Sequence, residues 1–275
     1  MTTSSLPILD RDLQSGDLTL KLAEIAEEAA RLILPFWRSG TAVETKSDDS
    51  PVTQADRAAE ALILERLAAL YPGVQTVAEE AVAADGAPTQ TDDWFWLIDP
   101  LDGTRGFVRG GEAFTVNIAL IHEGYPVAGV VTAPASETTW RSDRPGGGAL
   151  RRQYGAVHEG EAHAGAEWRP IAVRDRPQEG VALLSHSITD EEATRLAARH
   201  GCTHWQGTDS SLKFCLIAEG RFDAYPRTGP TSEWDTAAGQ AVLEAAGGRV
   251  LGADGQPLTY AKPGFLNGAF VAMGG

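Results

Sequence analysis

Residues 94–104, WFWLIDPLDGT, carry the clearest structural signal in the chain. The first five residues form an unbroken apolar run, which predicts a strand that is covered on both faces. Asp99 and Asp102 follow directly, and strands of such sheets end at the crevice where ligands bind. Asp-Pro and Asp-Gly are also turn dipeptides, so a plain turn is the alternative interpretation of these residues.

Acidic residues gather around this predicted strand. From Leu67 to Thr104 there is no lysine or arginine, and the stretch holds seven acids: Glu79, Glu80, Asp85, Asp92, Asp93, Asp99 and Asp102. A solvated acidic face explains Asp85, Asp92 and Asp93, whereas Glu79 ends a short strand predicted at residues 74–79. Clustered carboxylates repel one another unless a cation offsets their charge. Oxygen ligands without nearby thiolates or histidines favour Mg²⁺, so we expect a magnesium site.

The spacing of apolar residues predicts both helices and strands on either side of this stretch. Helices are predicted at residues 18–37, 190–200, 211–219 and 236–246, and another from Thr53, where Thr53 and Asp56 resemble a capping box. Strands are predicted at residues 114–122, 125–132, 181–185 and 222–225, and residues 133–170 are predicted to be rich in loops. Hairpin and crossover connections together indicate an α/β or layered α+β class. We place a boundary in the loops, between an N-terminal half (residues 1–145) and a C-terminal half (residues 146–275).

The composition narrows the classes of function. The chain has 275 residues and a formal net charge of −15, with a pI near 4.8. An acidic surface repels phosphate backbones, which argues against polymeric nucleic acid and anionic membranes as partners. Two cysteines without a Cys-x-x-Cys pair exclude a disulfide framework and a thiolate zinc site. With no apolar segment of membrane-spanning length and no signal-peptide pattern, we expect a cytoplasmic protein.

A second group of polar residues lies in the C-terminal half. Asp235 stands in residues 229–239, GPTSEWDTAAG, and a helix N-cap is its simpler explanation. Lys213 and Arg227 are cations on a strongly acidic chain, which favours a role as anion clamps, although surface salt bridges explain them equally well.

An aspartyl-phosphate mechanism needs Asp-x-Asp after a strand. Here Pro100 and Leu101 separate the two acids, which disfavours it.

Together these residues resemble the lithium-sensitive, magnesium-dependent phosphomonoesterase superfamily, which contains inositol monophosphatases, fructose bisphosphatases and bisphosphate nucleotidases. The superfamily pattern is an Asp, a Glu-Glu pair, DPLDGT, Trp-Asp and a late Gly-Gly. The chain has all five parts in that order: Asp48, Glu79-Glu80, residues 99–104, Trp234-Asp235 and Gly247-Gly248. The resemblance covers nearly the whole chain and implies an αβαβα sandwich and a homodimer.

Three stretches, residues 46–53, 210–215 and 225–231, are most similar to the 3′(2′),5′-bisphosphate nucleotidase branch, which is associated with sulfate assimilation. Inositol monophosphatases carry a Glu seven residues before the Trp, where this chain has Arg227. The resemblance implies removal of the 3′-phosphate from adenosine 3′,5′-bisphosphate, giving AMP, or from its 5′-phosphosulfate relative. An inositol monophosphatase, a histidinol-phosphatase or a sugar phosphatase is the alternative enzyme. A non-catalytic nucleotide or metal sensor is the alternative from another class.

The resemblance also implies a role for each matching residue. Two or three Mg²⁺ ions would be held by Glu79, Asp99, the Leu101 carbonyl, Asp102 and Asp235. Glu80 would support these ligands without binding an ion itself. Thr104, oriented by Asp48 (or by its neighbour Asp49), would take part in activating water. The substrate would be contacted by Gly103, Thr104, Ser210, Ser211, Lys213 and Arg227.

Overall fold

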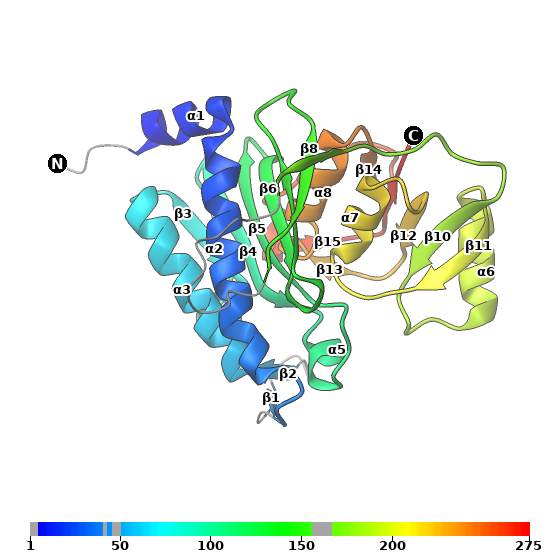
Figure 1. The fold of residues 1–275 in the computed structure, drawn as a ribbon, viewed down its shortest axis with the longest axis horizontal. Helices are drawn as coiled ribbons and strands as arrows, with labels where there is room; N and C mark the ends of the chain where they lie inside the picture. The colour runs from blue at the N-terminus through cyan, green and yellow to red at the C-terminus, as the bar shows by residue number, and fades with distance from the viewer. Residues whose placement is uncertain (1–4, 41–42, 46–50, 156–166) are drawn as a thin grey trace.

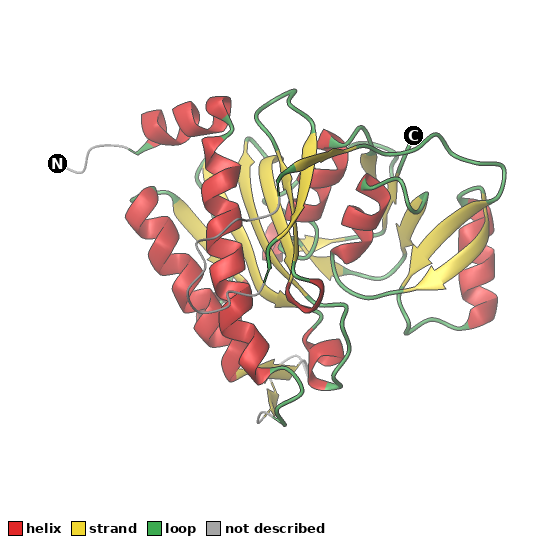
Figure 2. Ribbon diagram, viewed as in Figure 1, coloured by secondary structure: helices red, strands yellow, loops and turns green. Residues whose placement is uncertain are grey.

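The computed structural model describes residues 5–40, 43–45, 51–155 and 167–275. Two sheets and three groups of helices alternate in the order α–β–α–β–α (Figures 1 and 2). This confirms the αβαβα sandwich that the resemblance implies. Asp48, Asp49 and Ser50 lie outside the described residues.

The larger sheet has seven strands in the order β3-β4-β5-β6-β7-β8-β9. Its strands are β3 (Gln75–Ala78), β4 (Trp94–Asp102), β5 (Thr115–His122), β6 (Tyr125–Ala133), β7 (Thr138–Ser142), β8 (Ala149–Gln153) and β9 (Arg169–Ile171). Only the β3–β4 pair is parallel. Strand β4 is buried along most of its length, as the apolar run predicts for a strand covered on both faces.

The smaller sheet has five strands in the order β11-β10-β12-β16-β14. They are β10 (Gly180–Leu184), β11 (Cys202–Gly207), β12 (Ala224–Arg227), β14 (Arg249–Gly252) and β16 (Phe270–Met273). Two short pairs stand apart from both sheets: β1 (Val43–Thr45) with β2 (Pro51–Thr53), and β13 (Thr231–Ser232) with β15 (Leu266–Asn267).

Helices form the three remaining layers. One face of the larger sheet packs against α2 (Asp17–Ile33) and α3 (Gln54–Leu70), and α1 (Leu6–Ser15) packs against α2. The middle layer, α7 (Leu212–Ala218) and α8 (Ala237–Ala245), lies between the two sheets, and α6 (Asp190–Arg199) covers the outer side of the smaller sheet (Figure 1). Two short helices, α4 (Glu79–Asp85) and α5 (Thr104–Val108), directly follow β3 and β4.

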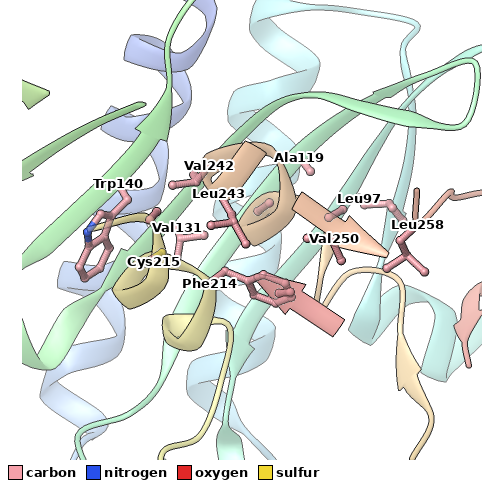
Figure 3. Packing of buried hydrophobic residues seen from close by; sticks show 14 of the residues in the cluster. Leu97, Ala119, Val131, Trp140, Phe214, Cys215, Val242, Leu243, Val250 and Leu258 are labelled. Carbon is pink, nitrogen blue, oxygen red and sulfur yellow. The ribbon is translucent and has the colours of Figure 1, made fainter. Parts of the chain in front are cut away.

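One of two large apolar cores fills the space between the sheets (Figure 3), and the other lies between the larger sheet and α2 and α3. Leu97, Ala119 and Val131 from the larger sheet pack against Phe214, Val242 and Leu243 of the middle helices. Gly129 on β6 allows α8 to approach the sheet closely, because a Cβ there would lie 2.6 Å from the Ala238 carbonyl oxygen. Helix α8 is therefore seated directly on the sheet, which fixes the residues at its start.

The predicted elements differ from the observed ones mainly at their ends. Helix α2 stops at Ile33, because Pro35 enters a short 3₁₀ turn over Leu34–Phe36. Thr53 is the N-cap of α3, and its capping box with Asp56 is confirmed. Where the sequence predicts mainly loops after residue 133, β7, β8 and β9 belong to the larger sheet.

The two sheets divide in sequence between β9 and β10, at residues 172–179. A division into two halves at residues 145 and 146 stays a prediction. Among the described helices, none is both long enough and apolar enough to span a membrane.

Candidate active site

A β-bulge in strand β4 brings the two acids of the DPLDGT stretch to one face. Side chains alternate along a strand, so residues three apart would normally point to opposite faces. Here Asp99 pairs with Asn117 and Asp102 pairs with Thr115, so β4 has one residue more than β5 between these pairs. The extra residue turns Asp102 to the side of Asp99, as bulges near active sites commonly do.

The Asp102 carboxylate contacts groups at the start of α7 and on strand β5. Its Oδ2 accepts a hydrogen bond of 2.5 Å from the Ser211 backbone N–H at the start of α7. Asn117 Nδ2 and Thr115 Oγ1 each lie 3.5 Å from the same oxygen. The Ser211 hydroxyl donates to Asn117 Oδ1 at 2.7 Å, which ties α7 to β5. The carboxylate is therefore fixed before any ligand binds.

Asp235 reaches the same place from the loop before α8. Its Oδ2 accepts a hydrogen bond of 3.0 Å from the Ser232 backbone N–H. The neighbouring Glu233 is fully buried and accepts hydrogen bonds from the backbone N–H groups of Ala261 and Lys262, at 2.8 and 2.9 Å. Trp234 packs in the core, as its residue type suggests. These contacts fix the loop, so Asp235 has little freedom to move.

Glu79 is the first residue of α4 and lines the site. The carboxylate of Glu60, on α3, accepts the backbone N–H groups of Glu80 and Ala81, both at 2.8 Å. A carboxylate at this position accepts hydrogen bonds from N–H groups that have no partner inside the helix. Its negative charge is also stabilised by the positive end of the helix dipole. Glu60, which the sequence interpretation missed, thus anchors the turn that carries Glu79 and Glu80.

Thr104 begins α5, directly after Gly103. Gly103 has a φ of +93°, and a Cβ there would lie 2.8 Å from the Ala113 carbonyl oxygen, so the turn requires glycine. The Thr104 hydroxyl lies 2.8 Å from the Leu101 carbonyl oxygen and 3.1 Å from Asp56 Oδ1. Whether Asp48 orients Thr104 stays a prediction, because Asp48 lies outside the described residues.

Asp99, Asp102 and Asp235 fit a metal ion. Each offers a carboxylate oxygen, and the three oxygens lie within 4.8 Å of one another. Burial raises the pKa of Asp102 to about 6. Burial also raises the pKa values of Asp99 and Asp235, and the neighbouring acids add to both increases. A cation would relieve this repulsion, and three hard oxygen donors suit Mg²⁺.

The two predicted cations lie at the edge of the same site. Lys213 is only 3% exposed, and its Nζ donates to the Ser210 carbonyl oxygen at 2.8 Å. Burial lowers its pKa to about 8, an effect that the nearby Asp102 partly opposes. Arg227, at the end of β12, donates to the carbonyl oxygens of Gly229 and Pro230, at 3.3 and 3.1 Å. All three of these acceptors are uncharged carbonyl groups, so the two positive charges remain available to an anion.

A pocket of about 480 Å³ joins these residues. Its lining includes the predicted site residues Glu79, Asp102, Gly103, Thr104, Ser210, Lys213, Arg227 and Asp235. Asp99 and Ser211 are buried behind it, and Ser211 contacts Asp102 and Asn117. Of the predicted serine pair, Ser210 is therefore the one that lines the pocket.

The pocket also has a polar wall that the sequence interpretation missed. It is formed by Ser185, His186 and Ser187 after β10, Asp209 after β11, Arg105 on α5 and Arg109 directly after α5. His186 Nδ1 lies 3.2 Å from Asp209 Oδ2, and its ring packs where a Cβ on Gly207 would lie. No short motif marks these residues, since they meet only when the strand ends are aligned.

The raised pKa values predict an unusual pH dependence for the metal-free protein. A carboxyl group with a raised pKa in the folded state contributes stability below its unfolded pKa, and this contribution is lost as pH rises through the folded value. With the pKa of Asp102 at about 6, the melting temperature in chelator should fall by on the order of 5 °C as the pH rises from 5 to 7.5. Differential scanning calorimetry would measure it.

The control for this prediction is Asp102→Asn, whose melting temperature in chelator should vary less over the same pH range. Added Mg²⁺ should raise the melting temperature of the unsubstituted protein more at pH 7.5 than at pH 5, because protons compete for the ligands. A chelated protein that is more stable at pH 7.5 would contradict this view of the cluster.

Known proteins resemble the chain over most of its length. The family model for the inositol monophosphatase family matches residues 17–273. The 3′(2′),5′-bisphosphate nucleotidase CysQ of Salmonella typhimurium is 40% identical over 254 residues, which are 91% of this chain and 97% of that protein.

Two solved structures agree with this result. CysQ from Bacteroides thetaiotaomicron, a bacterial member of the inositol monophosphatase family, has a TM-score of 0.75 at 31% identity, over 94% of this chain and 97% of that one. The inositol monophosphatase from Anabaena (Nostoc) has a TM-score of 0.72 at 27% identity, over 94% and 91% of the two chains. The metal-compatible carboxylates, the layered fold and these similarities lead to one conclusion: the chain belongs to the inositol monophosphatase family.

Proposed function

We propose that the chain is a 3′(2′),5′-bisphosphate nucleotidase that removes the 3′-phosphate of adenosine 3′,5′-bisphosphate, or of its 5′-phosphosulfate relative. The position of Arg227 is the observation that favours this activity over the other activities of the family. It places a cation at the pocket that also contains Asp102 and Asp235, so one site offers both a metal cluster and an anion clamp. A substrate with two phosphates uses both features.

The metal side of the pocket would carry out the hydrolysis. We propose two or three Mg²⁺ ions, held by Glu79, Asp99, the Leu101 carbonyl, Asp102 and Asp235. Such ions activate a water molecule and stabilise the charge that develops on the phosphate and the leaving oxygen.

The other residues of the pocket would bind the substrate. Backbone N–H groups of Gly103 and Thr104 would hold the phosphate to be removed, and the Thr104 hydroxyl would orient the attacking water. Ser210, Lys213 and Arg227 would bind the second phosphate or the ribose. Lys213 suits a fixed role in particular, because its ammonium group is already held by a carbonyl group and lies 4.8 Å from the Tyr225 ring centroid.

The nucleoside would extend toward the polar wall of His186 and its neighbours. This wall is the part of the pocket lining that contains no member of the acidic cluster, and His186 is held in place by Asp209. The pocket volume of about 480 Å³ lies within the usual range for small-molecule sites, roughly 300–1,000 Å³. The homodimer implied by the resemblance remains a prediction.

The identity of the product tests this function. Incubation with adenosine 3′,5′-bisphosphate and Mg²⁺ should yield adenosine 5′-monophosphate and one equivalent of inorganic phosphate, separated by liquid chromatography. Chelator should stop the reaction and Li⁺ should inhibit it. Release of adenosine 3′-monophosphate, or release that continues undiminished in chelator, would contradict the proposal.

A further inference from the structure

Tyr225 lies behind the two cations of the pocket. Lys213 and Arg227 line the pocket, whereas Tyr225 is not part of its lining and is only 5% exposed. Tyr225 and Arg227 are two residues apart on strand β12, so their side chains lie on the same face of the smaller sheet. Lys213 lies on α7, which packs against β12. One buried tyrosine is therefore placed to contact both cations.

The ring face and the hydroxyl of Tyr225 have different partners. The Lys213 ammonium nitrogen lies over the ring, 4.8 Å from its centroid, which is within the distance of a cation–π interaction. The phenol oxygen forms a hydrogen bond with the Arg227 side chain. A guanidinium group has no acceptor, so Arg227 is the donor of this bond. Tyr225 thus contacts Lys213 through its ring face and Arg227 through its hydroxyl group.

Two other aromatic side chains hold the Tyr225 ring in place. Phe214 follows Lys213 on α7, and Phe270 lies opposite Arg227 on β16. Each packs edge to face with the Tyr225 ring, and in each pair the ring centroids are 5.3 Å apart. Edge-to-face contacts are a favoured arrangement of aromatic pairs. The ring therefore has little freedom to turn away from either cation.

The partners that hold the two cations carry no charge. The other hydrogen bonds of Lys213 and Arg227 go to backbone carbonyl oxygens. Burial raises the pKa of Tyr225, so the phenol stays neutral at physiological pH. Burial lowers the pKa of Lys213 and the like charge of Arg227 adds to this decrease, so the two cations lie near enough to repel each other. A carboxylate partner would cancel their charge, whereas Tyr225 holds both cations and leaves the charge for an anion.

We propose that Tyr225 is a positioning residue for the second phosphate of the substrate, because it holds the Lys213 ammonium and the Arg227 guanidinium ready to bind that phosphate together. This inference rests on the proposed function, which assigns the second phosphate to these cations. Tyr225 acts through the two cations and lies outside the pocket lining. Long, flexible side chains lose conformational freedom when they bind a ligand, and side chains that are already held lose less.

Two substitutions separate the two contacts. Tyr225→Phe keeps the ring beside Lys213 and removes the oxygen that accepts from Arg227, whereas Tyr225→Leu also removes the ring face. For adenosine 3′,5′-bisphosphate, kcat/KM should fall about 3- to 10-fold in Tyr225→Phe and about 30-fold or more in Tyr225→Leu. A rise in KM should account for most of both losses, with kcat changed less than about threefold. The reason is that the second phosphate takes no part in bond breaking and is bound equally in the ground state and the transition state.

Adenosine 3′-monophosphate provides the comparison that a purely structural role would fail. It lacks the second phosphate, so both Tyr225 variants should keep kcat/KM for this substrate within about twofold. Because Tyr225→Phe acts through Arg227, its combination with Arg227→Ala should have the kcat/KM of Arg227→Ala alone for the bisphosphate. This cycle needs only the nearly isosteric Phe variant, so it decides the question even if Tyr225→Leu does not fold.

Tyr71→Phe is the matched control. Tyr71 is 1% exposed, its hydroxyl donates to Asp12 Oδ2 at 2.9 Å, and it is not among the residues that line the pocket. Loss of this hydroxyl should lower stability and leave kcat/KM for both substrates within about twofold. Equal losses on the two substrates in Tyr225→Phe, or losses that multiply with those of Arg227→Ala, would overturn the role of Tyr225.

The same assays separate this inference from the proposed function. If the unsubstituted protein has no preference for the bisphosphate over the monophosphate, the proposed function is wrong and the role of Tyr225 is wrong with it. If the unsubstituted protein prefers the bisphosphate and Tyr225→Phe keeps that preference in full, the proposed function stands and only the role of Tyr225 is wrong.

Discussion

Asp102→Asn is expected to lower kcat/KM for adenosine 3′,5′-bisphosphate by about a thousandfold or more. The substitution keeps the shape of the side chain, and its carbonyl oxygen can still accept the Ser211 N–H. It removes one of three carboxylates whose oxygens lie within 4.8 Å of one another. Each tenfold loss corresponds to about 1.4 kcal/mol, so this result requires a loss of about 4 kcal/mol of transition-state stabilisation. Steady-state phosphate release at saturating Mg²⁺ measures it.

The loss should not come from unfolding. Burial raises the pKa of Asp102, so its charge opposes folding in the metal-free state, and the neutral amide should leave the melting temperature in chelator unchanged or higher. Asp85→Asn, which changes an exposed acid at the end of α4, is the matched control and should keep full activity. Activity of Asp102→Asn within tenfold of the unsubstituted protein would rule out the proposed metal site.

Arg227→Glu should separate substrates by their second phosphate. We expect kcat/KM for adenosine 3′,5′-bisphosphate to fall by about 100-fold or more, because a hydrogen bond to a charged group contributes about 1.5–3 kcal/mol and the new carboxylate repels phosphate. Adenosine 3′-monophosphate lacks the second phosphate, so its kcat/KM should change less than about threefold. Initial rates over a range of concentrations of both substrates provide the comparison.

Arg195→Glu is the control for the change in net charge. Arg195 is exposed on α6 and is not among the residues that line the pocket, so its reversal should affect both substrates equally and weakly. Equal losses on both substrates in Arg227→Glu would show that Arg227 supports the fold of β12 rather than the second phosphate.

The sequence predicts the layers well, because they follow from apolar periodicity. The run at residues 94–98 gives a strand buried on both faces, and Thr53 with Asp56 gives the start of α3. The strands within residues 133–170 are harder to predict, since β7 and β8 are short and the glycines between them indicate loops equally well. Their order comes from pairing with β6, which is a tertiary effect.

The candidate site is only partly visible in the sequence for a similar reason. The spacing of Asp99 and Asp102 suggests a pair of ligands, but the bulge that places them on one face depends on pairing with β5. Asp56 is recognisable as a cap, yet its second contact is with a residue 48 positions away. His186 and Asp209 meet only because β10 and β11 lie side by side. Local patterns predict residue types, whereas these contacts require the assembled sheets.

The most direct test of the proposed function is a comparison of kcat/KM for adenosine 3′,5′-bisphosphate and inositol 1-phosphate, measured by phosphate release at saturating Mg²⁺. The cation at Arg227 predicts a preference for the nucleotide of about 100-fold or more, lost when Mg²⁺ is chelated. An equal or greater kcat/KM for inositol 1-phosphate would contradict the nucleotidase proposal.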